Sequence, residues 1–150
     1  MRFAAALLAA VAGPLLLSAL VGTGIHAYLR KAAPPVPHTV GEAVARRQGV
    51  RLIELLGSGA DPKLPIEGAF RDVAGGQPVK LTPLAFAVAN GDRDFARLLL
   101  LLQIPWTENE RRDAYCVGIA VKIAWIAQLI PDPGIEPAAC RVRLERLAVS

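Results

Sequence analysis

Residues 82–102 predict two short helices joined by a tight turn. Thr82 can accept a backbone N–H at a helix start, and Pro83 at the first helical position removes no donor that the helix needs. Gly91 favours the left-handed geometry that ends the first helix, and Asp92 or Asp94 can open the second. The second helix carries apolar residues at helical spacing: Phe95, Leu98, Leu99 and Leu102. Helices this short cannot bury their apolar faces alone, so we expect several such pairs to stack.

The same stretch resembles an ankyrin repeat. Residues 82–84 match the Thr-Pro-Leu opening of that family, Gly91 matches its turn, and residues 98–99 match its leucine run. Ala85 stands where the family has a histidine that braces the turn. The resemblance implies a solenoid of helix pairs with projecting hairpins, whose tips and inner helices form a binding surface.

A second copy of the pattern lies at residues 39–62. Thr39 and Glu42 form a capping-box pattern, which predicts a helix start. The run at 55–61 is similar to the end of an ankyrin repeat, in which Gly59 takes a positive φ and Asp61 begins the hairpin. The positions that define the repeats are therefore Thr82, Pro83, Leu84, Gly91, Leu98, Leu99, Gly59 and Asp61.

The spacing between the two copies is longer than the family period. Their Leu-Leu pairs, at 55–56 and 98–99, lie 43 positions apart (98 − 55), whereas ankyrin repeats recur about every 33 residues. The surplus falls in residues 61–81, which we expect to form an elongated hairpin or loop. The resemblance makes exposed side chains of this projection the expected contacts with a partner: Phe70, Arg71, Asp72, Gln77 and Lys80. A disordered insertion without a role is the alternative.

The C-terminal part departs from the repeat pattern but still favours helices. Thr107 and Glu110 form a second capping-box pattern, and we expect a break near Gly118 to give a third helix pair, 108–117 and 119–130. Pro137 can start a last helix that caps the stack. One face of that helix carries Cys140, Leu144 and Leu147. The predicted fold over residues 39–150 is an all-α, ankyrin-like solenoid of about three helix pairs.

Residues 3–25 contain no charged side chain and are long enough to cross a bilayer core of about 30 Å as a helix. A cleaved signal peptide is the alternative, but the run is long for one and a good cleavage site is hard to find. We therefore expect residues 1–31 to form a transmembrane anchor or an uncleaved signal, with residues 3–29 in the membrane. A proline-rich linker at 32–38 follows.

This segment predicts a single-pass protein of the bacterial inner membrane and leaves the side of the C-terminal domain open. Four cations within residues 30–47 favour a cytoplasmic domain, whereas a very short N-terminal tail with one arginine favours export. The even cysteine count permits a disulfide between Cys116 and Cys140. A buried, reduced cysteine in each helix is the alternative that we favour.

Charge and motifs favour binding over catalysis. The net charge is +4, and the basic residues are scattered without the interleaved aromatics that stack on bases, so we expect no nucleic acid. The sequence has no nucleophile elbow, Walker loop, His-Glu-x-x-His or Rossmann glycine pattern, and no Cys-x-x-Cys. We expect no catalytic residue, cofactor, metal or small-molecule substrate.

The sequence therefore predicts a membrane-tethered, ankyrin-like scaffold that binds another protein and is not an enzyme. One alternative is an exported periplasmic ankyrin-like protein, with its leader cleaved, that inhibits or stabilises a partner enzyme or toxin. A further alternative is a small multi-span membrane component in which residues 94–105 and 116–130 also lie in lipid. A mature N-terminus near Ala27 would favour the exported form, and an intact Met1 the tethered one.

Overall fold

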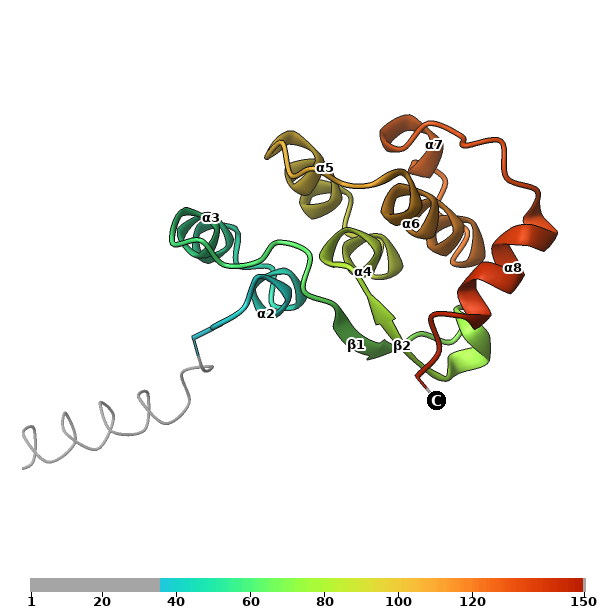
Figure 1. The fold of residues 1–150 in the computed structure, drawn as a ribbon, viewed down its shortest axis with the longest axis horizontal. Coiled ribbons are helices and arrows are strands. Elements are labelled where there is room, and N and C mark those ends of the chain that lie inside the picture. Colours follow the sequence, from blue (N-terminus) through green and yellow to red (C-terminus); the bar gives the residue numbers. More distant parts are fainter. Residues whose placement is uncertain (1–35, 150) are drawn as a thin grey trace, which may run out of the picture. The chain divides into compact units, whose positions relative to one another are not determined.

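The computed structural model describes residues 36–149, which form helices in two rows beside a small sheet (Figure 1). The outer row holds α3, α5 and α7, and the inner row holds α2, α4 and α6, with the sheet below it. The elements in chain order are α2 Val40–Ala45, α3 Gly49–Gly57, β1 Ile66–Ala69, the 3₁₀ helix η1 Ala74–Gly76, β2 Pro78–Leu81, α4 Pro83–Ala89, α5 Arg93–Leu101, α6 Glu108–Ala120, α7 Ile126–Leu129 and α8 Pro137–Glu145.

Helix α4 lies at the centre of the inner row, between α2 and α6. Its start is the predicted one, because the Thr82 hydroxyl accepts the Ala85 N–H at 3.3 Å and Pro83 is the first helical residue. Small side chains at Ala85 and Ala87 are fully buried and let the neighbouring helices approach closely. A larger side chain at either position would force the inner row apart.

Three further predicted helix starts, at Thr39, Asp92 and Thr107, are confirmed. Thr39 accepts the Glu42 N–H at 3.1 Å, although the Glu42 carboxylate accepts the His38 N–H instead of that of Thr39. Asp92 accepts the Phe95 N–H at 3.2 Å and opens α5. The capping box at the start of α6 is complete. Local capping chemistry therefore sets where the helices begin.

The predicted turns after α3 and α4 are also confirmed. Gly59 and Gly91 have φ values of +85° and +67°, a region in which side chains are strained. The Asp61 carboxylate accepts the Lys63 N–H at 2.8 Å and starts the turn that leads into the hairpin.

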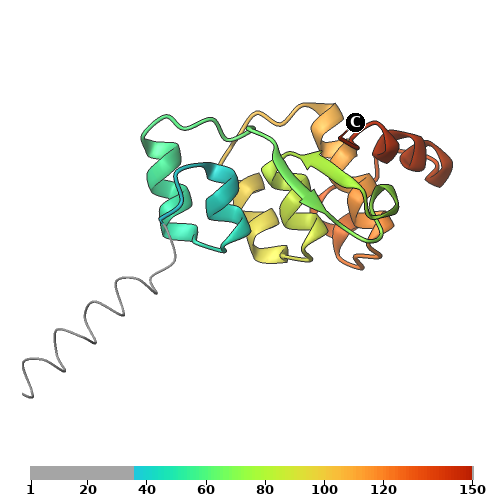
Figure 2. The ribbon, with the colours of Figure 1, turned by 90° about the horizontal axis from the view of Figure 1, so that it is seen from below.

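The prediction of an all-α solenoid is wrong, because part of the expected projection forms an antiparallel two-stranded sheet. Ile66 of β1 pairs with Leu81 of β2, and Ala69 pairs with Pro78. Burial alternates along β2, with Val79 buried between exposed neighbours, as a strand that covers a core requires. Figure 2 shows the sheet lying across α4, which both strands contact. The domain is therefore mixed α and β.

The predicted break at Gly118 is also wrong. Helix α6 continues to Ala120 and ends where Lys122 takes a φ of 58°. A Cβ on Gly118 would lie 2.5 Å from Cγ1 of Ile126, so the glycine permits close packing against α7 and does not end the helix. The expected helix over 119–130 is reduced to the four residues of α7.

The C-terminal helix α8 begins at Pro137 as predicted and packs on α6. After α8 the chain returns to the sheet. The Lys80 N–H donates to the Leu147 carbonyl at 3.0 Å, and the Val149 N–H donates to the Pro78 carbonyl at 2.8 Å. Residues 147–149 therefore cover the edge of β2 that faces away from β1 (Figure 1).

The predicted transmembrane helix at 3–25, within the anchor at 1–31, lies outside the described residues. Among residues 36–149, no helix is long and apolar enough to cross a membrane. As far as the described residues go, this finding counts against the predicted single-pass inner-membrane localisation and the membrane tether. The multi-span alternative places residues 94–105 and 116–130 in lipid, but both ranges belong to short helices interrupted by turns.

Candidate protein-binding groove

A groove of about 660 Å³ opens between η1, the C-terminal half of α6 and α8. We call it the α8 groove. The turn between the strands lines it with Asp72, Ala74, Gly75 and Gln77. Helix α6 contributes Cys116, Ile119 and Ala120, and the C-terminal part contributes Pro137, Cys140, Arg141, Leu144, Glu145 and Ala148.

The wall formed by η1 depends on an unusual run of backbone angles. Ala74, Gly75 and Gly76 have φ values of 47°, 67° and 83°, so the chain reverses within three residues. Val73 is fully buried and anchors this turn to the core. The reversal brings Asp72 and Gln77 to the same groove.

The wall formed by α8 is fixed to α6 by a disulfide between Cys116 and Cys140. The prediction of reduced cysteines is therefore wrong, although both side chains are buried as expected. Arg143 adds an ion pair with Asp113 of α6 and donates to the Asn109 carbonyl at 3.1 Å. Covalent, ionic and apolar contacts together hold α8 in place.

The groove has an apolar floor and a polar rim. Leu144 and both cysteines are buried, whereas Ile119 is 43% exposed. The rim carries exposed side chains of both charges: Asp72, Arg141 and Glu145, with the Gln77 amide. An apolar centre surrounded by polar groups is typical of surfaces that bind other proteins.

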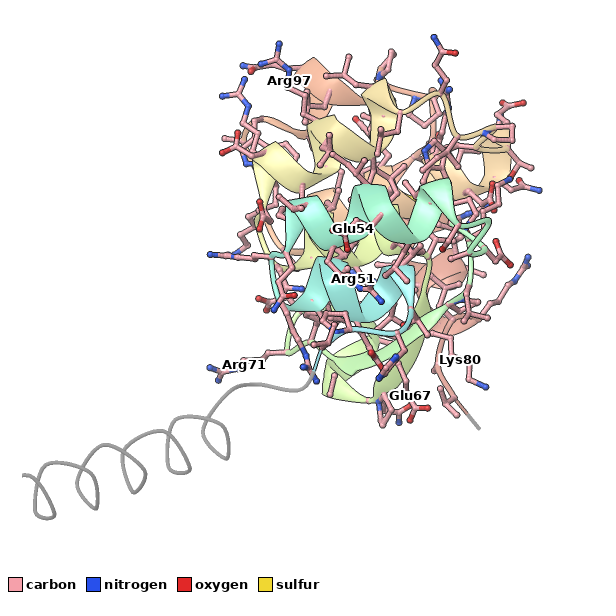
Figure 3. The ribbon with its side chains drawn as sticks, turned by 90° about the vertical axis from the view of Figure 1, so that its left-hand side faces the viewer. Arg51, Glu54, Glu67, Arg71, Lys80 and Arg97 are labelled. Carbon is pink, nitrogen blue, oxygen red and sulfur yellow. A yellow bond between two sulfur atoms is a disulfide. The ribbon has the colours of Figure 1, made fainter. Side chains whose placement is uncertain are left out.

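The structure brings together only two of the five predicted contact residues, Asp72 and Gln77. Arg71 and Lys80 are exposed outside the groove lining, and Figure 3 shows them projecting from opposite sides of the hairpin. Phe70 is half-buried, and its ring packs edge-to-face on Phe86 of α4 with centroids 5.4 Å apart. Phe70 therefore serves packing of the sheet on α4.

The sequence did not point to the α8 side of the groove. Arg141 and Glu145 lie one helical turn apart on an amphipathic helix, which indicates a common face. It does not indicate what that face lies beside. The opposing wall comes from residues 72–77, far away in the sequence, and only the folded chain places them together.

A polar cluster away from the groove fixes the start of α6. The Lys63 ammonium donates to the Glu110 carboxylate at 3.0 Å and to the Pro105 carbonyl at 2.6 Å, and it lies 5.9 Å from the centre of the Trp106 ring. Burial opposes ionisation of Glu110, but hydrogen bonds from Thr107 and Lys63 outweigh it and lower the pKa of this carboxyl. This cluster joins the chain after α3 to α6.

Two further observations concern metal binding and proton transfer. Among residues 36–149, no three His, Cys, Asp or Glu side chains are grouped so that they could hold a metal ion. Burial, with a smaller effect from Asp132, raises the pKa of Tyr115, so its phenol keeps its proton near neutral pH. The expected lack of a catalytic residue, cofactor, metal, small-molecule substrate and nucleic acid stays a prediction.

No protein-family model, no curated protein and no solved structure matches the chain. The resemblance to ankyrin repeats therefore stays a prediction from the motifs at 39–62 and 82–102.

Proposed function

We propose that this chain is a non-catalytic module that binds another protein through the α8 groove, in an oxidising compartment. The observation that carries the proposal is the lining of the groove. It combines an apolar floor with Asp72 and Gln77, two residues that the sequence independently indicates as partner contacts.

The lining favours a protein partner over a small molecule. Sites for small ligands hold a few polar groups that converge on the ligand from within the pocket. In the α8 groove the charged groups lie on the exposed rim, and among the described residues that are buried none is polar or charged. A protruding side chain of a partner fits such a floor, with its polar neighbours on the rim.

The walls support binding because they are fixed before the partner arrives. Cys116 and Cys140 tie α8 to α6, and Val73 anchors the opposing turn. A preformed site loses less conformational entropy on binding than a mobile one. We expect little change of the backbone around the groove between the free and bound states.

The disulfide also supports the assignment to an oxidising compartment. Disulfides persist in exported proteins and are rare where thiol reductants are abundant. Of the functions predicted from the sequence, the one that we carry forward is therefore an exported protein that inhibits or stabilises a partner.

Site-specific photocrosslinking in a bacterium that produces and exports the chain tests this proposal. A benzophenone amino acid replaces Gln77 in the groove or, as the matched control, Arg97, which is exposed on α5 far from the groove (Figure 3). We expect one discrete adduct from position 77 that disappears when Ile119 is also changed to Asp. An adduct from position 97 only, or a position-77 adduct that the Ile119→Asp change leaves intact, would refute the groove as the binding site.

A further inference from the structure

Strand β2 is paired on both sides, and its pairing fixes which way the main chain of β1 points. The Lys80 N–H and the Pro78 carbonyl bind residues 147–149. Main-chain groups alternate along a strand, so the groups of the two residues next to Lys80 face β1 instead. These two residues, Val79 and Leu81, pair with Gly68 and Ile66 of β1.

The other edge of β1 is therefore open. Alternation directs the N–H and C=O of Glu67 and Ala69 away from β2. Within residues 36–149 these groups have no hydrogen-bond partner. The two strands of the sheet thus differ, because the C-terminal residues cover β2, whereas no segment of the described part of the chain pairs with the outer edge of β1.

The open edge of β1 contains no proline, lysine or bulge that would block pairing with another chain. Edge strands are commonly protected by proline, lysine or a bulge. Strand β1 has the sequence Ile-Glu-Gly-Ala and pairs with β2 in a continuous register. Residues 147–149 already show that this sheet accepts a short extended segment through main-chain hydrogen bonds.

Side chains of β1 alternate between the core and solvent. The face of Gly68 is closed, because a Cβ there would lie 2.9 Å from the Phe70 ring and 3.0 Å from the Phe86 ring. Glu67 is exposed on the other face, where Figure 3 shows it with Lys80. Lys80 is its cross-strand neighbour, yet among the described residues the Glu67 carboxylate makes no ion pair. A lysine or arginine on a strand added at the open edge would form a cross-strand ion pair with this carboxylate.

We propose that the open edge of β1 binds an extended segment of a partner protein by strand addition, with a lysine or arginine of that segment beside Glu67. The edge supplies four main-chain hydrogen-bonding groups, and the carboxylate supplies the preference for a basic segment. This surface lies on the opposite side of β2 from residues 147–149, so the inference stands independently of the α8 groove.

A second copy of the chain fits this edge less well. Two β1 strands paired around Gly68 place Glu67 opposite Ala69, which supplies no cation. Pairing around Glu67 places two carboxylates together, which is repulsive. The strand is also only four residues long, too short for the interface of roughly 1,000 Å² or more that a stable dimer needs.

Fluorescence anisotropy with two labelled peptides tests the inference on the purified full chain. The probes are acetyl-Thr-Val-Thr-Lys-Thr-Val-Thr-amide and the same peptide with glutamate in place of lysine. We expect the wild type to bind the lysine peptide about three-fold more tightly than the glutamate peptide, the scale of one cross-strand ion pair. Glu67→Lys should reverse this preference. No binding of the lysine peptide, or equal binding of both peptides, overturns the inference.

Substitutions at Ala69 separate strand addition from simple charge attraction. Ala69→Pro removes an outward N–H that β2 does not use, so the sheet should persist while peptide binding is lost. Ala69→Val keeps the N–H and should bind like the wild type. Circular dichroism confirms folding of each variant. Unchanged binding by a folded Ala69→Pro variant overturns strand addition. If that variant does not fold, the lysine peptide N-methylated at its lysine decides, because it keeps the charge but loses a main-chain N–H, and unchanged binding of that peptide overturns strand addition.

Discussion

Cys116 of α6 and Cys140 of α8 are joined by a disulfide, and both residues line the α8 groove. One covalent bond therefore fixes the distance between the two helices that form most of the groove. Stability of the domain and integrity of the proposed binding site are linked through this bond.

Removal of the disulfide should destabilise the domain. The cysteines are 24 positions apart, and a loop of that length predicts a loss of about 3 kcal/mol in the free energy of unfolding for Cys116→Ala with Cys140→Ala. Urea unfolding of the variant and the wild type measures the loss. The variant in the presence and absence of dithiothreitol is the control, because reductant should lower the stability of the wild type alone. Equal sensitivity of both proteins to reductant would contradict the role of the bond.

The close approach of α6 and α7 requires a glycine. Gly118→Ala places a Cβ where Cγ1 of Ile126 lies, and we expect a loss of about 2 kcal/mol in the free energy of unfolding from overpacking. Gly57→Ala is the matched control, because nothing lies within 4 Å of a Cβ at the end of α3. The control should leave stability unchanged or raise it slightly. Equal effects of the two substitutions would show that Gly118 is not under steric constraint.

The start of the central helix depends on one hydroxyl. Thr82→Ala removes the acceptor for the Ala85 N–H and should lower the free energy of unfolding by about 1 kcal/mol, whereas Thr82→Ser should retain most of the wild-type value. Thermal and urea unfolding compare the three proteins. An alanine variant as stable as the serine variant would show that Pro83 and burial alone set this helix start.

Acid should weaken the cluster at the start of α6. The folded-state pKa of Glu110 is lowered below its usual value of 4.5, so its stabilisation is present above about pH 4.5 and is lost as the pH falls through the folded-state pKa. Glu110→Gln should therefore be less stable than the wild type at pH 7, by about 1 kcal/mol, and the difference should shrink below pH 4. Glu67→Gln is the control, because Glu67 has no partner among the described residues. A difference for Glu110→Gln that does not vary with pH would contradict this assignment.

Local features of the fold were predictable from the sequence, and long-range ones were not. The starts at Thr82 and Asp92 and the turn at Gly91 depend on hydrogen bonds within a few residues, so the sequence contains their full cause. The strand at 78–81 has only two buried positions, a signal too short to distinguish from a loop. A glycine at position 118 is compatible both with the end of a helix and with the close approach of a neighbouring helix. Only the position of α7 in the folded chain distinguishes the two.

The candidate site depended almost wholly on long-range contacts. The sequence predicts Asp72 and Gln77 as partner contacts because the surplus between the two repeat-like stretches indicates an exposed projection. Phe70 lies in the same surplus segment and is therefore also predicted as an exposed contact, but its ring packs on Phe86 of α4. Pairing of the two cysteines requires the orientation of α8 on α6, which no sequence pattern here specifies.

Hydrogen exchange of the chain, free and bound to the partner that position 77 captures, tests the central claim most directly. Amide exchange should slow on binding at residues 72–77 and 137–145, the two walls of the α8 groove, and should be unchanged in α3 and α5. Slowed exchange confined to α3 and α5, with both walls unchanged, would contradict binding through the groove.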